Sequence, residues 1–139
     1  MIRAQCANYC LHVNILNMAI AFARISYHSR SQGHSAVAGA AYRAGVELKD
    51  NRTGEVHSFK NRSDVIYSEI LLPEGAAIQF KDRETLWNAV EAAEMRRNSQ
   101  IAKDIVLALP RDLDLSLQID LARNFANSHF VRYGIVADI

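Results

Sequence analysis

One tyrosine lies in a predicted helix whose other side chains are small. Ser35 can cap a helix by accepting from an early backbone N–H, and Gly45 suits the left-handed residue that ends one, so residues 36–44 are predicted to be helical. Tyr42 stands seven residues past Ser35, about 10 Å along that helix. Its neighbours three and four positions away are mostly small: Ala38, Gly39, Gly45 and Val46. A large ligand could therefore approach the Tyr42 hydroxyl, although a rim tyrosine on a helix packed against a sheet gives the same pattern.

Basic residues and the helix start favour an anionic ligand near this tyrosine. Arg30 and His34 precede the helix, and Arg43 follows the tyrosine directly. Free N–H groups and the dipole at a helix N-terminus attract phosphate, and arginine offers a planar fork that matches it. We therefore predict a tyrosine presented to a phosphodiester, with Arg30, His34 and Arg43 contacting DNA. The alternative is that these three side chains are only solvent-exposed.

The 139 residues carry a net charge of only +1, but the charges are unevenly distributed. Residues 1–62 contain eight Lys or Arg and three Asp or Glu, whereas residues 63–139 contain eight and twelve. This asymmetry indicates an anionic partner for the first part, unless it is chance in a short stretch.

Composition excludes several classes of protein. Half of the residues are hydrophobic and 22% are charged, which is typical of one globular domain rather than a disordered chain. No uninterrupted apolar stretch of about 18 residues is present, so no membrane-spanning helix is predicted. Cys6 and Cys10 are too few for a disulfide framework, and even with His12 they lack the fourth ligand of a structural zinc site.

The first 17 residues are predicted to lie outside the fold. Asn14 and Asn17 interrupt their apolar run, which is not the pattern of a secretory signal. A chain that begins at Met18 reads directly into a strand-like segment. We therefore interpret residues 1–17 as a leader from an upstream start codon and residues 18–139 as the folded part.

The predicted elements mix strands and helices without a regular βαβ alternation. Strands are predicted at residues 20–27, 65–72, 101–109 and 135–139, with a hairpin of 46–49 and 55–59. Besides 36–44, helices are predicted from a cap at Asp82 to about Arg97 and from a cap at Ser116 to Gly134. This pattern indicates an α+β fold, an antiparallel-rich sheet with helices packed on its face. The stop inside the last predicted strand suggests a chain that has been cut.

Five runs of sequence resemble, in order and spacing, the N-terminal part of the MobA/MobL family of plasmid mobilisation relaxases, which includes TraA-like conjugative relaxases. The runs are residues 33–45, with the core Ser-Ala-Val-Ala…Ala-Tyr-Arg-Ala-Gly, and residues 53–57, 67–73, 82–94 and 98–110. The resemblance implies an HUH-relaxase-like but incomplete fold in a cytoplasmic protein. It also implies single-stranded DNA at an origin of transfer as partner, with other mobilisation or relaxosome proteins and no membrane.

The resemblance further implies a chemistry. A relaxase tyrosine attacks the scissile phosphate of one DNA strand and stays joined to the 5′ phosphate, and the family's motif maps onto Tyr42. A tyrosine with a pKa near ~10 is a poor nucleophile, so a divalent Mg²⁺ or Mn²⁺ ion is expected in the complete domain. Its His-x-His ligands lie further downstream in the family, so no metal ligand is assigned here. Asp104 takes the place of a Glu that many relatives hold near the metal and is assigned a catalytic role, the alternative being a solvated strand end.

Three functions remain open at this stage. The first is the tyrosine-bearing part of a relaxase nuclease domain that by itself neither nicks nor joins DNA efficiently. The second is a catalytically inactive DNA-binding fragment or remnant that occupies the origin or modulates an intact relaxase. The third is the product of a degraded gene that does not fold stably.

Overall fold

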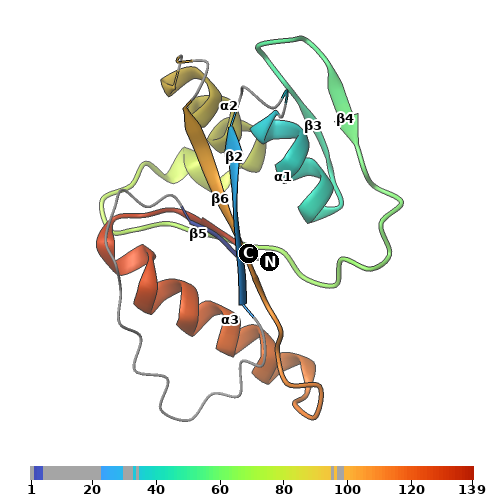
Figure 1. Cartoon of the computed structure of the whole chain (residues 1–139), viewed down its shortest axis with the longest axis vertical. Coiled ribbons are helices and arrows are strands. Elements are labelled where there is room, and N and C mark those ends of the chain that lie inside the picture. Colours follow the sequence, from blue (N-terminus) through green and yellow to red (C-terminus); the bar gives the residue numbers. More distant parts are fainter. Residues whose placement is uncertain (1, 5–22, 30–32, 34, 95, 97–98) are drawn as a thin grey trace.

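Five antiparallel strands form the central sheet of the computed structural model, which describes residues 2–4, 23–29, 33, 35–94, 96 and 99–139 (Figure 1). In spatial order the strands are β2 (Ala23–Ser29), β6 (Gln100–Leu107), β1 (Ile2–Ala4), β7 (Ala137–Asp138) and β5 (Ile70–Leu71). All four pairings between them are antiparallel. The predicted antiparallel α+β fold is therefore confirmed.

The remaining elements are three α-helices, two short 3₁₀ helices and a separate hairpin within the described part of the chain. The helices are α1 (Ala36–Ala44), α2 (Arg83–Ala93) and α3 (Leu115–His129), with η2 (Ile78–Lys81) and η3 (Val131–Tyr133). The hairpin pairs β3 (Glu47–Lys49) with β4 (Val56–Ser58). None of the described helices is long and apolar enough to cross a bilayer.

Helices cover both faces of the sheet. Because successive strand residues point to opposite faces, Asp104 on β6 faces α1 whereas its neighbour Ile105 packs in the core of α3. On β7, Asp138 likewise contacts α2, whereas Ala137 packs with α3. Figure 1 shows the same division, with α1 and α2 on one side of the sheet and α3 on the other.

Helix α1 has the bounds and both caps predicted from the sequence. The Ser35 hydroxyl accepts from the Ala38 N–H, and Gly45 ends the helix at φ +64°. Between these caps, one face of small residues is buried against the sheet and α2: Ala36, Val37, Ala40, Ala41 and Ala44. Small side chains let the helix backbone approach its neighbours closely, and this fixes the direction of the larger residues on its other faces.

A buried carboxylate ties α2 to the sheet. Both carboxylate oxygens of Asp138 accept from the Arg83 guanidinium, at N···O distances of 2.7 to 3.1 Å, and Oδ2 also accepts from Trp87 Nε1 at 2.8 Å. Arg83 and Trp87 are one helical turn apart on α2, so Asp138 binds two side chains on the same face of the helix.

Several predicted boundaries differ from the structure. Helix α3 is capped by Asp114, which accepts from the Leu117 N–H, and the predicted cap Ser116 instead donates to Asp114. Helix α2 ends at Ala93, short of Arg97, which lies outside the described residues. Of the strand predicted at 65–72, only Ile70–Leu71 forms β5, with Glu69 just before it exchanging two backbone hydrogen bonds with Ile139.

The prediction that residues 1–17 lie outside the fold does not hold for Ile2–Ala4. These three residues form β1, hydrogen-bonded between β6 and β7 with Arg3 opposite both Asp104 and Asp138. Residues 5–17 lie outside the described part of the chain. The assignment of residues 18–139 to a nuclease domain stays a prediction.

Removing the charge of Asp138 is expected to destabilise the chain by about 3 kcal/mol, because Arg83 would be left as a poorly paired and mostly buried cation. Urea unfolding of Asp138→Asn measures this difference. Asp120→Asn is the matched control, since its side chain is 61% exposed and should change stability by less than about 0.5 kcal/mol. Equal unfolding midpoints for the two variants would contradict the role given to Asp138.

Candidate active site

Tyr42 lies on the outer side of α1, and 48% of its surface is exposed. Its helical neighbours are small, as predicted, but a later segment flanks the ring. Phe59 meets it edge to face, with ring centroids 5.3 Å apart, and the Arg62 guanidinium carbon lies 4.0 Å from the ring centroid. Phe59 and Arg62 therefore flank a ring whose helical neighbours are small, and nearly half of the tyrosine surface remains open to solvent.

Arg43 points in a different direction from Tyr42, since consecutive helical residues are about 100° apart. Its guanidinium donates to the Gly39 carbonyl at 2.7 Å and pairs with Asp104 on β6. Only 17% of the side chain is exposed. The alternative that Arg43 is simply solvent-exposed is therefore wrong, and a DNA phosphate near it would share the guanidinium with Asp104.

Asp104 is a buried carboxylate near the middle of β6, with 3% of its surface exposed. It pairs with Arg43 from α1 and with His28 Nε2 from β2. His28 Nε2 also lies 2.9 Å from Arg43 Nη2. The structure thus brings two predicted site residues, Arg43 and Asp104, into contact. The alternative that Asp104 is a solvated strand end is wrong, because its carboxylate is buried.

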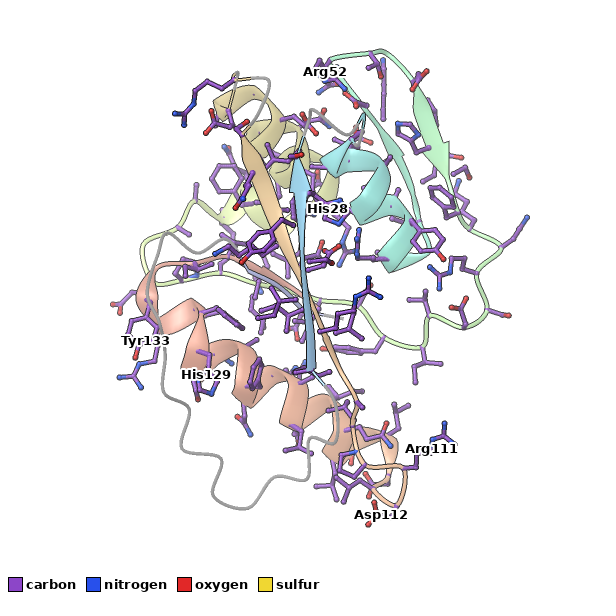
Figure 2. All side chains as sticks on the ribbon, in the orientation of Figure 1. His28, Arg52, Arg111, Asp112, His129 and Tyr133 are labelled. Atoms are coloured by element: carbon purple, nitrogen blue, oxygen red, sulfur yellow. The ribbon has the colours of Figure 1, made fainter. Side chains whose placement is uncertain are left out.

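His28 is a member of this cluster that the sequence did not single out. It lies on β2, whose antiparallel pairing with β6 sets Ser26 opposite Asp104 and His28 two residues further along the same face (Figure 2). His28 and Asp104 are 76 residues apart in the sequence, so their contact could be found only once the pairing of β2 with β6 was known. The predicted DNA contacts Arg30 and His34 lie outside the described residues.

The start of α1 is already occupied by carboxylates of the chain itself. Glu91 on α2 accepts from the Ala36 N–H at 2.6 Å, and Asp50 accepts from the Ser35 hydroxyl at 2.7 Å. Arg52 lies 3.7 Å from Asp50 and 3.8 Å from Glu91. The predicted free, anion-attracting helix start is therefore wrong, because these carboxylates already supply the negative charge that this helix end attracts.

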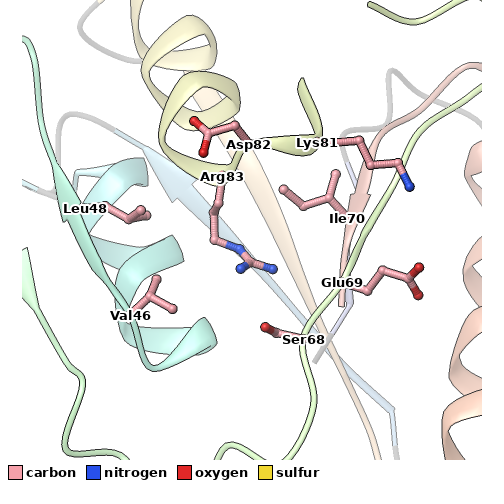
Figure 3. Close-up of a pocket in the computed structure, with 8 residues that line it drawn as sticks. All are labelled: Val46, Leu48, Ser68, Glu69, Ile70, Lys81, Asp82 and Arg83. Atoms are coloured by element: carbon pink, nitrogen blue, oxygen red, sulfur yellow. The ribbon is translucent and has the colours of Figure 1, made fainter. Parts of the chain in front are cut away.

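A cavity of about 450 Å³ lies away from Tyr42, beside β3, β5 and the start of α2 (Figure 3). The Arg83 side chain extends into it, but that guanidinium is paired with Asp138. Two carboxylates also line it: Glu69 accepts from Tyr67 and Arg123, and Asp82 accepts from the Thr85 N–H at the start of α2. Because these charged groups already have hydrogen-bond partners within the chain, we take Tyr42, together with Asp104, Arg43 and His28, as the candidate site.

No group of three or more His, Cys, Asp or Glu among the described residues is arranged to hold a metal ion. Asp104 and His28 are engaged with each other and with Arg43, whose positive charge disfavours a cation at the same carboxylate. The described residues therefore do not fit the Mg²⁺ or Mn²⁺ ion expected from the sequence, which stays a prediction for the complete domain.

Known proteins resemble the chain over most of its length. The MobA/MobL family model matches residues 34–139. The chain is 41% identical over 111 residues to Mobilization protein MobL of Acidithiobacillus ferridurans, which covers 80% of this chain and 29% of that protein. It is 34% identical over 131 residues to Conjugal transfer protein TraA of Rhizobium radiobacter, covering 87% and 12%. A structure reported as "Molecular Basis of Vancomycin Resistance Transfer in Staphylococcus aureus" gives a TM-score of 0.74 at 35% identity, covering 84% of this chain and 66% of that one.

The carboxylate at the start of α1 should make stability depend on acid. Burial pushes the pKa of Asp50 upward, but hydrogen bonds from the Ser35 hydroxyl and the Arg52 and Thr53 N–H groups outweigh it, and the net pKa lies below its ordinary 3.8. A lowered folded-state pKa gives stability that is complete above pH 3.8 and is lost as the pH falls through the folded value.

Asp50→Asn should therefore be less stable than the unchanged chain by about 2 kcal/mol at neutral pH, and the difference should shrink below pH 3.8. Urea unfolding at several pH values measures both. Asp112→Asn, in an exposed turn, should keep a constant small difference. A difference for Asp50→Asn that grows on acidification would reverse the sign and refute this account.

Proposed function

We propose that this chain, which belongs to the MobA/MobL family, carries the tyrosine-bearing part of a DNA relaxase and presents Tyr42 to single-stranded DNA at an origin of transfer. The observation that carries the proposal is a half-exposed tyrosine fixed on a helix whose opposite face is buried. The next residue of that helix, Arg43, is held by His28 and the buried Asp104. The mobilisation and conjugal transfer names of the relatives support it.

The reaction is a transfer between two phosphodiesters. The Tyr42 phenol oxygen forms a bond to phosphorus while the bond between phosphorus and the 3′ oxygen breaks. The 5′ phosphate stays on Tyr42, and the proton lost by the phenol is balanced by one gained at the 3′ hydroxyl. The reverse reaction rejoins the strand, and a divalent ion bound in the complete domain would offset charge on the phosphate.

Asp104 acts in this proposal as a positioning residue. It is buried, and it pairs with Arg43 from α1 and with His28 from β2, so it fixes the direction of the arginine that follows Tyr42. A phosphate that reaches Arg43 would share its guanidinium with Asp104, His28 and the Gly39 carbonyl. Relaxosome proteins and the cytoplasm, where plasmid DNA is found, are the proposed setting.

A second candidate is a DNA-binding fragment without nicking activity. The chain covers 29% of MobL and 12% of TraA, so the catalytic activity of those whole proteins does not transfer to it automatically. The basic balance of residues 1–62 supports DNA binding independently of the tyrosine. A covalent adduct between Tyr42 and DNA is expected only for the first candidate, whereas salt-dependent DNA binding is expected for both.

A hybrid protein tests the tyrosine. The 111 matching residues of the Acidithiobacillus ferridurans MobL are replaced by those of this chain, and covalent attachment to single-stranded origin DNA is followed on denaturing gels with Mg²⁺ or Mn²⁺. Tyr42→Phe should reduce the adduct by at least about a hundredfold, because the nucleophile is gone. Tyr133→Phe, at a tyrosine that is 57% exposed, is the matched control and should leave it unchanged.

The 139-residue chain alone should form little of this adduct. Full adduct formation by Tyr42→Phe in the hybrid would refute the assignment of the nucleophile. A Tyr42-dependent adduct formed efficiently by the isolated chain would refute the expectation that further residues are needed.

Binding of the isolated chain to single-stranded DNA should weaken steeply with salt. Neutralising three or four phosphates gives a loss of about twenty- to fiftyfold between 50 and 200 mM salt. Fluorescence anisotropy measures this slope, and Arg30→Gln should reduce it by about 0.7. Arg111→Gln is the control, because that exposed residue lies far from His28 (Figure 2). Undetectable or salt-independent binding would exclude the electrostatic contact.

A further inference from the structure

The segment that follows the β3–β4 hairpin wraps the C-terminal end of α1. The Phe59 N–H donates to the Val46 carbonyl at 3.0 Å, which sets its ring against Tyr42. A Cβ on the helix-ending Gly45 would lie 3.4 Å from Val65 and 3.6 Å from the Arg62 Cβ. The segment from Phe59 to Val65 is therefore in close contact with the helix end that carries the tyrosine.

Three contacts fix the Arg62 guanidinium beside Tyr42. Nε donates to Asp64 Oδ1 at 3.0 Å, and Nη2 pairs with the other carboxylate oxygen. Nη1 donates to the Tyr42 carbonyl at 2.9 Å. With one side held by Asp64 and the other by the helix backbone, the guanidinium carbon lies 4.0 Å from the centroid of the phenol ring.

We propose that Arg62 is a positioning residue for Tyr42, and that its fixed positive charge favours the negative charge that develops on the phenol oxygen as it attacks phosphorus. The inference rests on the proposed function of Tyr42 as nucleophile. A guanidinium does not lose its proton in the physiological range, and its planar form suits contact with an aromatic face.

The surrounding charges agree with this role. The pKa of Arg62 is raised, mainly by its hydrogen bond with Asp64, then by the charge of Asp64 and, further, by the ionised form of Tyr42.

Asp64 does not cancel the effect of the arginine. Its side chain is 64% exposed, whereas that of Arg62 is 25% exposed and lies against the ring. Water screens the carboxylate more strongly than the guanidinium. Asp64 therefore orients the cation, and the guanidinium rather than the carboxylate is the charged group in contact with the ring.

A phosphorus electrophile that needs neither DNA nor metal tests the proposal on the 139-residue chain. In the reaction with diisopropyl fluorophosphate, the phenol oxygen bonds to phosphorus, the P–F bond breaks, and the phenol proton goes to solvent as fluoride leaves. Mass spectrometry of peptides gives the labelling rate at each tyrosine. Tyr133 serves as an internal reference, because the guanidinium near its ring belongs to Arg132, which the Arg62 variants leave unchanged.

Arg62→Gln should slow labelling of Tyr42 relative to Tyr133 by about three- to fivefold, the effect of one nearby screened charge. Arg62→Lys, which restores the charge, should recover at least half of the loss. Lys60→Gln is the matched control, because it removes a charge from the same segment that pairs with Glu47, and it should leave the rate unchanged. Arg62→Met keeps the aliphatic stem beside Gly45 and replaces the Gln variant if circular dichroism shows that the latter is unfolded.

Labelling at the unchanged rate in folded Arg62→Gln or Arg62→Met would overturn the proposal. Equal slowing by Gln and Lys would also overturn it, because packing rather than charge would then be responsible. The result is independent of the hybrid experiment. If the hybrid that retains Tyr42 forms no DNA adduct, the proposed function is refuted whatever the labelling rates are. If that hybrid forms the adduct but Arg62→Gln does not slow labelling of Tyr42, only the role of Arg62 is refuted.

Discussion

Close packing of the small face of α1 is the constraint on which the candidate site depends. Ala40, Ala41 and Val37 are almost fully buried, so the helix backbone lies near the sheet and cannot rotate without exposing them. With that face fixed, Tyr42 must point outward and Arg43 must turn toward β6. The tyrosine is exposed because its neighbours are buried, and the arginine meets a buried carboxylate for the same reason.

Carboxylates of the chain itself then complete the electrostatics of the helix. Asp50 and Glu91 satisfy its start, and Asp104 engages Arg43 near its end. Each of these three side chains is almost fully buried, and each has a hydrogen-bond partner on or beside α1. A buried charge is costly unless it is paired, so these contacts hold the helix in one position as well as one rotation. Such rigidity suits a nucleophile that must meet phosphorus in a defined geometry.

The sequence was informative where structure is decided locally. The caps of α1, the exposed Tyr42 and the antiparallel α+β fold were predicted from short-range patterns and are confirmed. The family predicted from five motifs is confirmed too. The contacts of Glu91 and His28 were not found, because the partners are 55 and 76 residues away along the chain. The start of α3 was misplaced for another reason: Asp114 and Ser116 are both good caps by residue type, and Asp114 is the one that accepts from the Leu117 N–H.

Identifying the residue that becomes covalently linked to DNA tests the role of Tyr42 as nucleophile most directly. After the hybrid protein has reacted with single-stranded origin DNA, nuclease and protease digestion leaves a short nucleotide on one peptide, whose position mass spectrometry identifies. The account predicts a 5′-phosphate linkage on Tyr42 in the peptide from α1. A linkage on Tyr27, Tyr67 or Tyr133, or on a serine, would contradict it.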